Sequence, residues 1–278
     1  MKKLLIALLL LGSCTKPEPI EIITDDLKGR IYNDTTLTAD REWMLSGRVS
    51  IMPGYTLTIE PGTVIKGRLG TGANASCLII TNGAKINAVG TPQQPIIFTA
   101  DGDVPPSVRG LWGGLLILGK APCSFKSDVT ELQIEGIPTS DTNGLYGGSI
   151  ADDNSGSLQY ISIRHGGAEI GEGNEINGLT LGGVGSGTTI NHIEVLGNVD
   201  DGIEFFGGTV NATNLLVLGQ GDDAIDIDQA YAGTIDGALV VLTAASDHGF
   251  EIDGPEGSAP GRFTLKNATV NGATDDCD

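Results

Sequence analysis

The feature that most constrains the fold of this chain is a pair of short strands that returns every 22 to 24 residues. The first strands of three consecutive repeats are HIEVL (192–196), NLLVL (214–218) and ALVVL (238–242), which share the valines Val195, Val217 and Val241. The second strands, at a matching offset, are DGIEFF (201–206), DAIDID (223–228) and HGFEID (248–253). Repeats of about 20–25 residues with two or three short strands are typical of a parallel β-helix, whose coils stack about 4.8 Å apart. The sequence therefore predicts an all-β solenoid.

Strand alternation predicts which side chains of these repeats face the core. Successive residues of a strand point to opposite faces, so the apolar member of each pair should turn inward. The resulting inward columns are Ile203/Ile225/Phe250 and Phe205/Ile227/Ile252. One coil cannot bury such a face by itself, whereas a stack of coils can. The 42 glycines among 278 residues and the lack of sustained helical periodicity agree with a chain of strands and tight turns.

Several blocks of the sequence, taken in order, resemble a known group of bacterial proteins. The blocks are TLTIEPGTVIKG, RGLWGGLLILGKAP, GSLQYISIRHGG, NEINGLTLGGVGSGTTINHIEV and DDGIEFFGGTVN. Together they resemble uncharacterised outer-membrane lipoproteins with a right-handed parallel β-helix core, over about residues 30–272. The resemblance implies a surface-attached right-handed parallel β-helix and brings with it no known activity.

The N-terminal sequence MKKLLIALLLLGSC has the features of a secretory signal. Two lysines precede an apolar run that is too short to span a bilayer as a mature helix. The Leu-Gly-Ser-Cys ending resembles a bacterial lipobox, which implies a signal peptide over 1–14 and a lipid on Cys14. No aspartate follows the cysteine directly, so retention in the inner membrane is not signalled. We therefore expect a protein anchored in the outer membrane through this lipid, on the periplasmic or the cell-surface side.

Composition divides the remaining chain into a tether and a solenoid. Residues 15–40 are polar and contain prolines, as expected for a tether and lead-in. Residues 41–278 form the predicted β-helix, whose last strand is followed by no capping segment; this predicts a truncated sequence or a partner over the exposed edge. Segment 120–157 is rich in Pro, Gly, Asp and Ser, and we expect it to be a loop excursion from one coil.

The cysteines give no disulfide framework. Export from the cytoplasm permits disulfides, and Cys77, Cys123 and Cys277 remain besides the lipidated residue. Three cysteines cannot all pair within the chain, and their spacing matches no framework pattern. We therefore assign no disulfide.

The charge of the chain limits its partners. The formal net charge is −19 and the pI is about 4.3. Nucleic-acid binding is disfavoured, because phosphate recognition needs clustered lysines and arginines. Cations, neutral glycans or another surface protein are more suitable partners, and a polyanionic glycan would need a metal bridge or a local basic patch.

The residues that alternation turns outward in the three repeats are mostly acidic. They form a ladder of five carboxylates: Glu204, Asp226, Asp228, Glu251 and Asp253. Like charges at coil spacing repel, and solvation, a raised pKa or a bound cation would relieve the repulsion. Calcium prefers several carboxylate and carbonyl oxygens, so it is the candidate cofactor for such a ladder. Because no EF-hand or nonapeptide calcium repeat occurs, we expect a solvated acidic face and assign no metal ligand firmly.

Three acidic blocks also resemble polygalacturonases, which are right-handed β-helix hydrolases. The blocks NVDDGIE, GDDAIDI and SDHGFEI stand in the same order as the Asn-Thr-Asp, Gly-Asp-Asp and Gly-His-Gly blocks of those enzymes. By this resemblance Asp222 or Asp223 would be the general acid, Asp201 would help to activate water and His248 would tune them. The first block lacks the threonine, Asp247 replaces a glycine, and no Arg-x-Lys substrate clamp follows.

Our prediction is a lipid-anchored surface β-helix with a binding or structural role, with a glycan as the candidate ligand and no cofactor other than calcium. The alternative is a polygalacturonase-like inverting glycoside hydrolase acting on a polysaccharide. Trp112, Tyr146 and Phe206 could stack on a glycan if they were exposed. His165 and His192 lack metal-ligand spacing and are expected to be structural.

Overall fold

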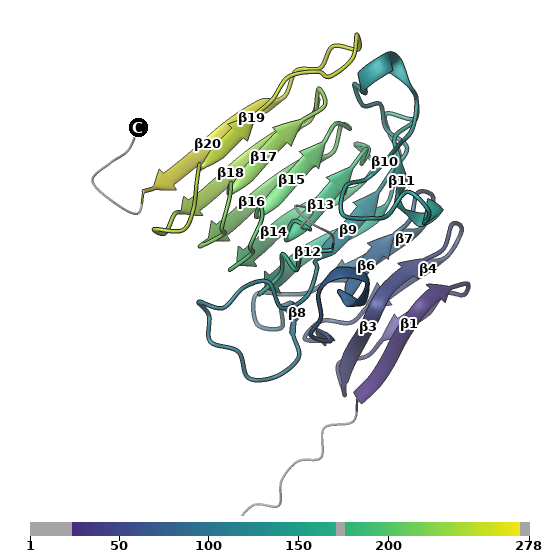
Figure 1. Ribbon diagram of the computed structural model, residues 1–278, viewed down its shortest axis with the longest axis vertical. Coiled ribbons are helices and arrows are strands. Elements are labelled where there is room, and N and C mark those ends of the chain that lie inside the picture. Colours follow the sequence, from purple (N-terminus) through teal and green to yellow (C-terminus); the bar gives the residue numbers. More distant parts are fainter. Residues whose placement is uncertain (1–23, 171–175, 273–278) are drawn as a thin grey trace, which may run out of the picture.

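The computed structural model describes residues 24–170 and 176–272 and shows a right-handed parallel β-helix (Figure 1). The coil strands are β1 (Thr24–Ile31), β2 (Thr35–Leu37), β3 (Glu42–Ile51), β4 (Thr56–Ile59), β5 (Val64–Gly67), β6 (Cys77–Ile80), β7 (Lys85–Val89), β8 (Ile96–Ala100), β9 (Leu115–Leu118), β12 (Gly156–Arg164), β13 (Leu179–Gly182), β14 (Thr189–Leu196), β15 (Ile203–Phe206), β16 (Asn211–Leu218), β17 (Ile225–Asp228), β18 (Thr234–Val241), β19 (Phe250–Ile252) and β20 (Thr264–Asn271). The predicted fold class is confirmed.

Each coil in the C-terminal half consists of one long and one short strand. The long strands β12, β14, β16, β18 and β20 pair in parallel with one another in chain order. The short strands β9, β13, β15, β17 and β19 pair in parallel in the same way. We call the second set the short-strand sheet. Parallel pairing at a constant offset places equivalent residues of successive coils directly above one another.

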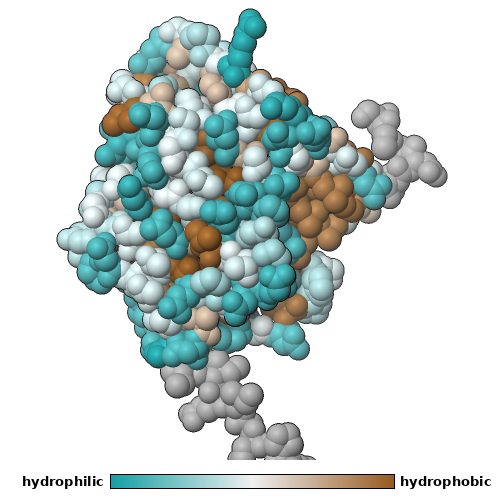
Figure 2. All heavy atoms as spheres, turned by 180° about the vertical axis from the view of Figure 1, so that it is seen from behind, coloured by the Kyte–Doolittle hydropathy of each residue, from teal (hydrophilic) through white to brown (hydrophobic). Residues whose placement is uncertain are grey.

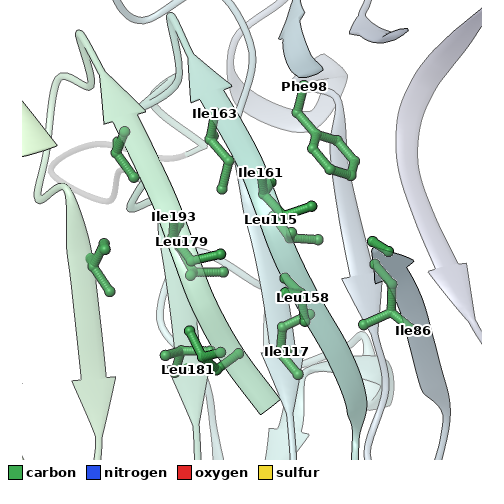
Figure 3. Close-up of a cluster of buried hydrophobic side chains, with 14 of the residues drawn as sticks. Ile86, Phe98, Leu115, Ile117, Leu158, Ile161, Ile163, Leu179, Leu181 and Ile193 are labelled. Carbon is green, nitrogen blue, oxygen red and sulfur yellow. The ribbon is translucent and has the colours of Figure 1, made fainter. Parts of the chain in front are cut away.

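The core lies between these sheets and is made of the predicted apolar columns. Ile203 pairs with Ile225 and Ile225 with Phe250, while Phe205 pairs with Ile227 and Ile227 with Ile252. Figure 3 shows the inward side chains of neighbouring coils, among them Leu179 and Leu181, packed against one another. At Gly202 an added Cβ would lie 2.3 Å from a Val217 methyl group, so only glycine allows the coils to pack this closely there.

The predicted valine column is wrong at its last member. Val217 pairs with Val240, and Val241 pairs with Leu218 on the outer face. Both strands bend at a residue with positive φ, Asn214 in β16 and Gly237 in β18, and these bends align the coils. A shift of one residue exchanges the inner and outer faces of a strand, so Val240 is buried whereas the adjacent Val241 is only partly buried.

The coils begin earlier in the chain than residue 41, where the sequence predicted the start of the β-helix. β1 already pairs in parallel with β3. Cys14, Cys277 and the signal segment lie outside the described residues, so those predictions remain predictions. Cys77 and Cys123 are free thiols. Among the described helices none is long and apolar enough to cross a membrane.

The segment between β9 and β12 leaves the coil and covers part of the short-strand sheet. It contains the antiparallel pair β10 (Leu132–Gln133) and β11 (Leu145–Tyr146) and the short helices η2 (Lys126–Asp128) and η3 (Thr142–Gly144). A further short helix, η1 (Gly72–Asn74), precedes β6. Phe125, Ile137 and Tyr146 of this excursion pack on outward side chains of the sheet, such as Leu118 and Phe206, and form a second apolar cluster. Figure 1 shows the excursion in teal beside β9 and β13.

Apolar side chains also remain on the outer surface. Leu218 and Leu239 on the long strands are exposed, and so are Ile252 and Val270 in the last two strands. Figure 2 shows apolar surface gathered on one flank, whereas the rest of that face is mixed.

The stacked core can be tested with two leucines of opposite burial. Leu181→Ala removes a fully buried side chain and should destabilise the protein by about 2–5 kcal/mol, because a cavity remains. Leu239→Ala, at a site that is 45% exposed, should change stability by no more than about 0.5 kcal/mol. Urea unfolding measures both, and equal effects would contradict the assigned register.

Candidate functional site

One column of polar residues lies two positions before the strands β13, β15, β17 and β19 of the short-strand sheet. Its members, in coil order, are Asn177, Asp201, Asp223 and His248. The backbone N–H of Asp223 donates to Asp201 Oδ1 at 3.0 Å. The backbone N–H of His248 donates to Asp223 Oδ1 at 2.7 Å, and His248 Nδ1 lies 2.9 Å from the same oxygen. Each aspartate therefore caps the turn of the next coil.

This capping role weakens the polygalacturonase-like interpretation of the same residues. Asp201 and Asp223 are buried and hold backbone groups, while Asp222 is exposed. Oxygen atoms of Asp201 and Asp222 lie within 4.8 Å of each other. Inverting glycosidases hold their two carboxyl groups about 6.5–9.5 Å apart, with a water molecule between them. The predicted set is thus brought together, but at a separation that does not favour inverting hydrolysis.

Three carboxyl groups lie close together at this column, one of them from Asp201 of the column itself. We call Asp201, Glu204 and Asp226 the buried trio. They are only 7%, 5% and 9% exposed, and one oxygen from each lies within 4.8 Å of the other two. Glu204 and Asp226 do lie on the outer face of the sheet, as alternation predicts. The expected solvated face is nevertheless wrong for these two residues, because both are buried. The charge of Glu135, in the excursion, acts on both carboxyl groups.

Electrostatic strain in the buried trio is shown by its pKa values. Removal from water, followed by the charge of Asp200, raises the pKa of Asp201 to about 9. Burial, followed by the charges of Glu135 and Asp226, raises the pKa of Glu204 well above its usual range. Burial also raises the pKa of Asp226. The charges that act most strongly on the trio are other carboxylates, so attraction to a basic side chain does not offset the cost of burial.

Two oxygen atoms at the buried trio lack hydrogen-bond partners within the described part of the chain. They are Asp226 Oδ1 and Asn177 Oδ1, and both are buried. The Asn177 side chain donates a hydrogen bond from Nδ2 to Glu204, which places its amide against the trio. Buried polar atoms normally have partners. Carboxylate and amide oxygens in this arrangement match the ligand preferences of a hard divalent cation such as Ca²⁺.

A proton is the competing occupant of the same site. The Glu204 carboxyl group is placed to share a hydrogen bond with Asp226, which raises the pKa of Glu204 and lowers that of Asp226 relative to burial alone. At low pH a shared proton relieves the repulsion between the two groups. At neutral pH a divalent cation would relieve it more completely, because it neutralises two charges.

Two further groups of potential ligands lie nearer the surface. Asp200 and Asp222 each place a carboxylate oxygen within 4.8 Å of Asp201, and we call these three residues the outer trio. Asp223, Asp247 and His248 form the other group. Hydrogen bonding to Asp223 raises the pKa of His248, whose side chain is 61% exposed. The outer trio shares Asp201 with the buried trio and includes the exposed Asp222.

The remaining ladder residues lie beyond the buried trio. Asp228 is half-buried and accepts a hydrogen bond from the Gln229 backbone at 2.5 Å, and burial raises its pKa to about 6. Glu251 and Asp253 are exposed, as expected for a solvated face. A hydrogen bond with Asp223, followed by desolvation, raises the pKa of Glu251 to about 7.

The predicted aromatic platforms are not available to a glycan. Trp112, Tyr146 and Phe206 are buried, and Trp112 Nε1 donates to the Arg164 carbonyl at 2.7 Å. His165 is buried with Nδ1 2.5 Å from the Val108 carbonyl oxygen, which agrees with a structural role.

The sequence interpretation missed Asn177 and Glu135. NGL at 177–179 has the same offset as DGI at 201–203, so alignment of one more coil would have found Asn177. Glu135 belongs to the excursion, which lies outside the coil repeat, so the repeat could not predict that Glu135 lies near the ladder.

A comparison with protein families agrees with this architecture. A family model described as a pectate-lyase like beta helix domain matches residues 29–276. The chain belongs to the pectate-lyase-like β-helix family. No curated protein and no solved structure gives a significant match. Membership of the pectate-lyase-like β-helix family supports a polysaccharide-related protein in general.

The buried trio predicts a stability that depends on both pH and calcium. The pKa of Asp201 rises from 3.8 unfolded to about 9 folded, so the folded state keeps a proton that the unfolded state releases. Stability should therefore fall as pH rises between about 4 and 9. In chelator we expect a lower Tm at pH 8 than at pH 5, and calcium should raise Tm at pH 8 but have little effect at pH 5.

Asp226→Asn tests whether the trio causes this behaviour. Removal of one repelling charge should raise Tm at pH 8 in chelator by about 2–4 °C, the shift that corresponds to roughly 1 kcal/mol in a chain of this size. It should also remove most of the response to calcium. Asp103→Asn, which changes net charge equally at an exposed loop site, should retain that response. Thermal melts that show no dependence on calcium in the unmodified protein would contradict the cation site.

Proposed function

We propose that this protein binds polysaccharide at the bacterial cell surface through a divalent cation, without cleaving the chain. The observation that carries the proposal is the buried trio, in which Asp226 Oδ1 has no hydrogen-bond partner within the described residues. Fully ionised, the trio has more negative charge than its burial can sustain, and a cation that displaces the protons balances that charge.

The chemistry of the site favours a uronate-containing polysaccharide as the ligand. A protein with a formal charge of −19 repels a polyanion unless a cation lies between them. The outer trio is more exposed than the buried trio, so a cation held by Asp201 and Asp222 keeps coordination positions for ligand carboxylates. Neutral sugars would coordinate the same ion more weakly, through hydroxyl groups.

Binding without cleavage is supported by the roles of the aspartates. A general acid must reach the glycosidic oxygen, whereas Asp223 is 2% exposed and occupied by hydrogen bonds from His248. The proposal therefore gives Asp223 a role in the architecture of the site and leaves coordination of the cation to Asp201 and its acidic neighbours.

The binding experiment uses immobilised polygalacturonate. Retention of the protein should require calcium and should weaken at least tenfold in chelator. Glu204→Gln combined with Asp226→Asn should cause a similar loss, while Asp103→Asn should bind normally. Binding that is equally strong in chelator would contradict the proposal. Release of reducing ends that Asp223→Asn abolishes would instead support the hydrolase.

We further propose that Cys14 carries the lipid that holds the protein at the outer membrane. The support is the lipobox-like ending of the N-terminal apolar run. Bacteria that express the full chain and are fed an alkyne fatty acid should label it, and Cys14→Ser should abolish the label. Cys277→Ser is the matched control and should keep it. Labelling of the Cys14→Ser variant would exclude this anchor.

A further inference from the structure

A groove of about 300 Å³ lies on the long strands, away from the acidic residues described above. It crosses β12, β14 and β16 and is bordered by Pro92 and Pro95, which belong to the turn between β7 and β8. Ile161 and Ile193 contribute to its floor, while their side chains are packed in the core. Its volume is at the lower end of the range for small-molecule sites.

An aromatic pair stands in this groove. The rings of Tyr160 and His192 are stacked, with centroids 4.3 Å apart and an angle of 22° between their planes. Tyr160 is half-buried and His192 is exposed, so ring surface remains open to solvent. The two residues lie in adjacent coils, because Ile161 pairs with Ile193.

The backbone at this pair is unusual for such side chains. Every long strand from β12 to β20 has a residue with positive φ in its interior, and these residues are Tyr160, His192, Asn214, Gly237 and Asn267. Asparagine and glycine tolerate this conformation, whereas a bulky residue such as tyrosine rarely adopts it. Among these five long strands, only two have an aromatic residue at that position, Tyr160 in β12 and His192 in β14, and both of these residues line the groove. Backbone strain of this kind is concentrated at functional sites.

Polar groups flank the rings on the same strands. Ser162 Oγ donates to Glu194 Oε1 at 2.6 Å and accepts from Arg164 Nε at 2.7 Å. Arg164 also lies 3.4 Å from Glu194, so the pair is neutral as a unit. Fixed donors and acceptors beside an aromatic surface suit vicinal hydroxyl groups above an apolar C–H face.

We propose that this groove binds neutral sugar residues of a glycan, with Tyr160 and His192 as the stacking platform and Arg164 and Glu194 as hydrogen-bonding partners for hydroxyl groups. The charge balance of the groove favours a neutral ligand over an acidic one. Its mixture of ring surface and planar polar groups favours a sugar over an apolar peptide, which would remove the charged pair from water without offering it hydrogen bonds. The site is independent of the cation and goes beyond the function proposed above.

The neighbouring coils supply the variants for the test. Tyr160→Asn combined with His192→Asn replaces the platform with the residue type that Asn214 and Asn267 already provide at the same bend. The fold should therefore be retained, with a Tm equal to or higher than that of the unmodified protein. Tyr32→Asn is the matched control, because Tyr32 is an exposed tyrosine that does not line the groove.

Affinity electrophoresis in chelator, with galactomannan, xyloglucan or mixed-linkage β-glucan in the gel, measures the binding. At least one of these neutral polysaccharides should retard the unmodified protein and the Tyr32→Asn control to the same extent. The double variant should bind at least tenfold more weakly. Equal retardation of the double variant, or no retardation of the unmodified protein by any of the three, would overturn the proposal. Neither result depends on calcium, so the outcome is separate from that of the polygalacturonate experiment.

Discussion

Parallel pairing of each short strand with its counterpart in the next coil is the constraint on which the rest of this structure depends. It places every residue directly above the residue at the same offset one coil earlier. For apolar positions such as Phe205 and Ile227, this stacking builds a continuous core. For acidic positions such as Glu204 and Asp226, the same stacking forces like charges together, and no change of register could separate them without exposing the core.

The excursion over the short-strand sheet turns this repulsion into a site. Exposed carboxylates stacked on an outer face would be screened by water and salt. The apolar side chains around Tyr146 pack over this sheet, and Glu135 adds a further negative charge, so protonation or a bound cation must balance the charge. The excursion also divides the ladder of carboxylates. Glu204 is buried, whereas Glu251 and Asp253, at the last short strand, are exposed to solvent.

The two faces of the solenoid use the repeat in different ways. On the short-strand sheet, the aspartate column holds successive turns together, because Asp201 and Asp223 accept backbone hydrogen bonds from the coil that follows. On the long strands, the bend column is less uniform. Asn214 and Asn267 donate side-chain hydrogen bonds to the preceding coil, whereas Tyr160 and His192 stack on each other. At this position the fold constrains the backbone conformation and leaves the side chain free to vary. Two adjacent coils have aromatic residues there, and these form the stacked pair in the groove.

The sequence by itself determined the solenoid, the inward columns and the stacking of the acidic ladder, since all three follow from strand alternation at a constant coil length. It placed the valine column one residue out at Val241, because this strand has two adjacent valines and Val217 pairs with the first of them, Val240. It could not pair Tyr160 with His192, which lie 32 residues apart, well outside the 22-to-24-residue repeat. Only the tertiary structure decided which carboxylates lose water, because that depends on where a non-repeating segment folds back. Local periodicity determines direction and register, whereas burial is set by contacts between segments far apart in the chain.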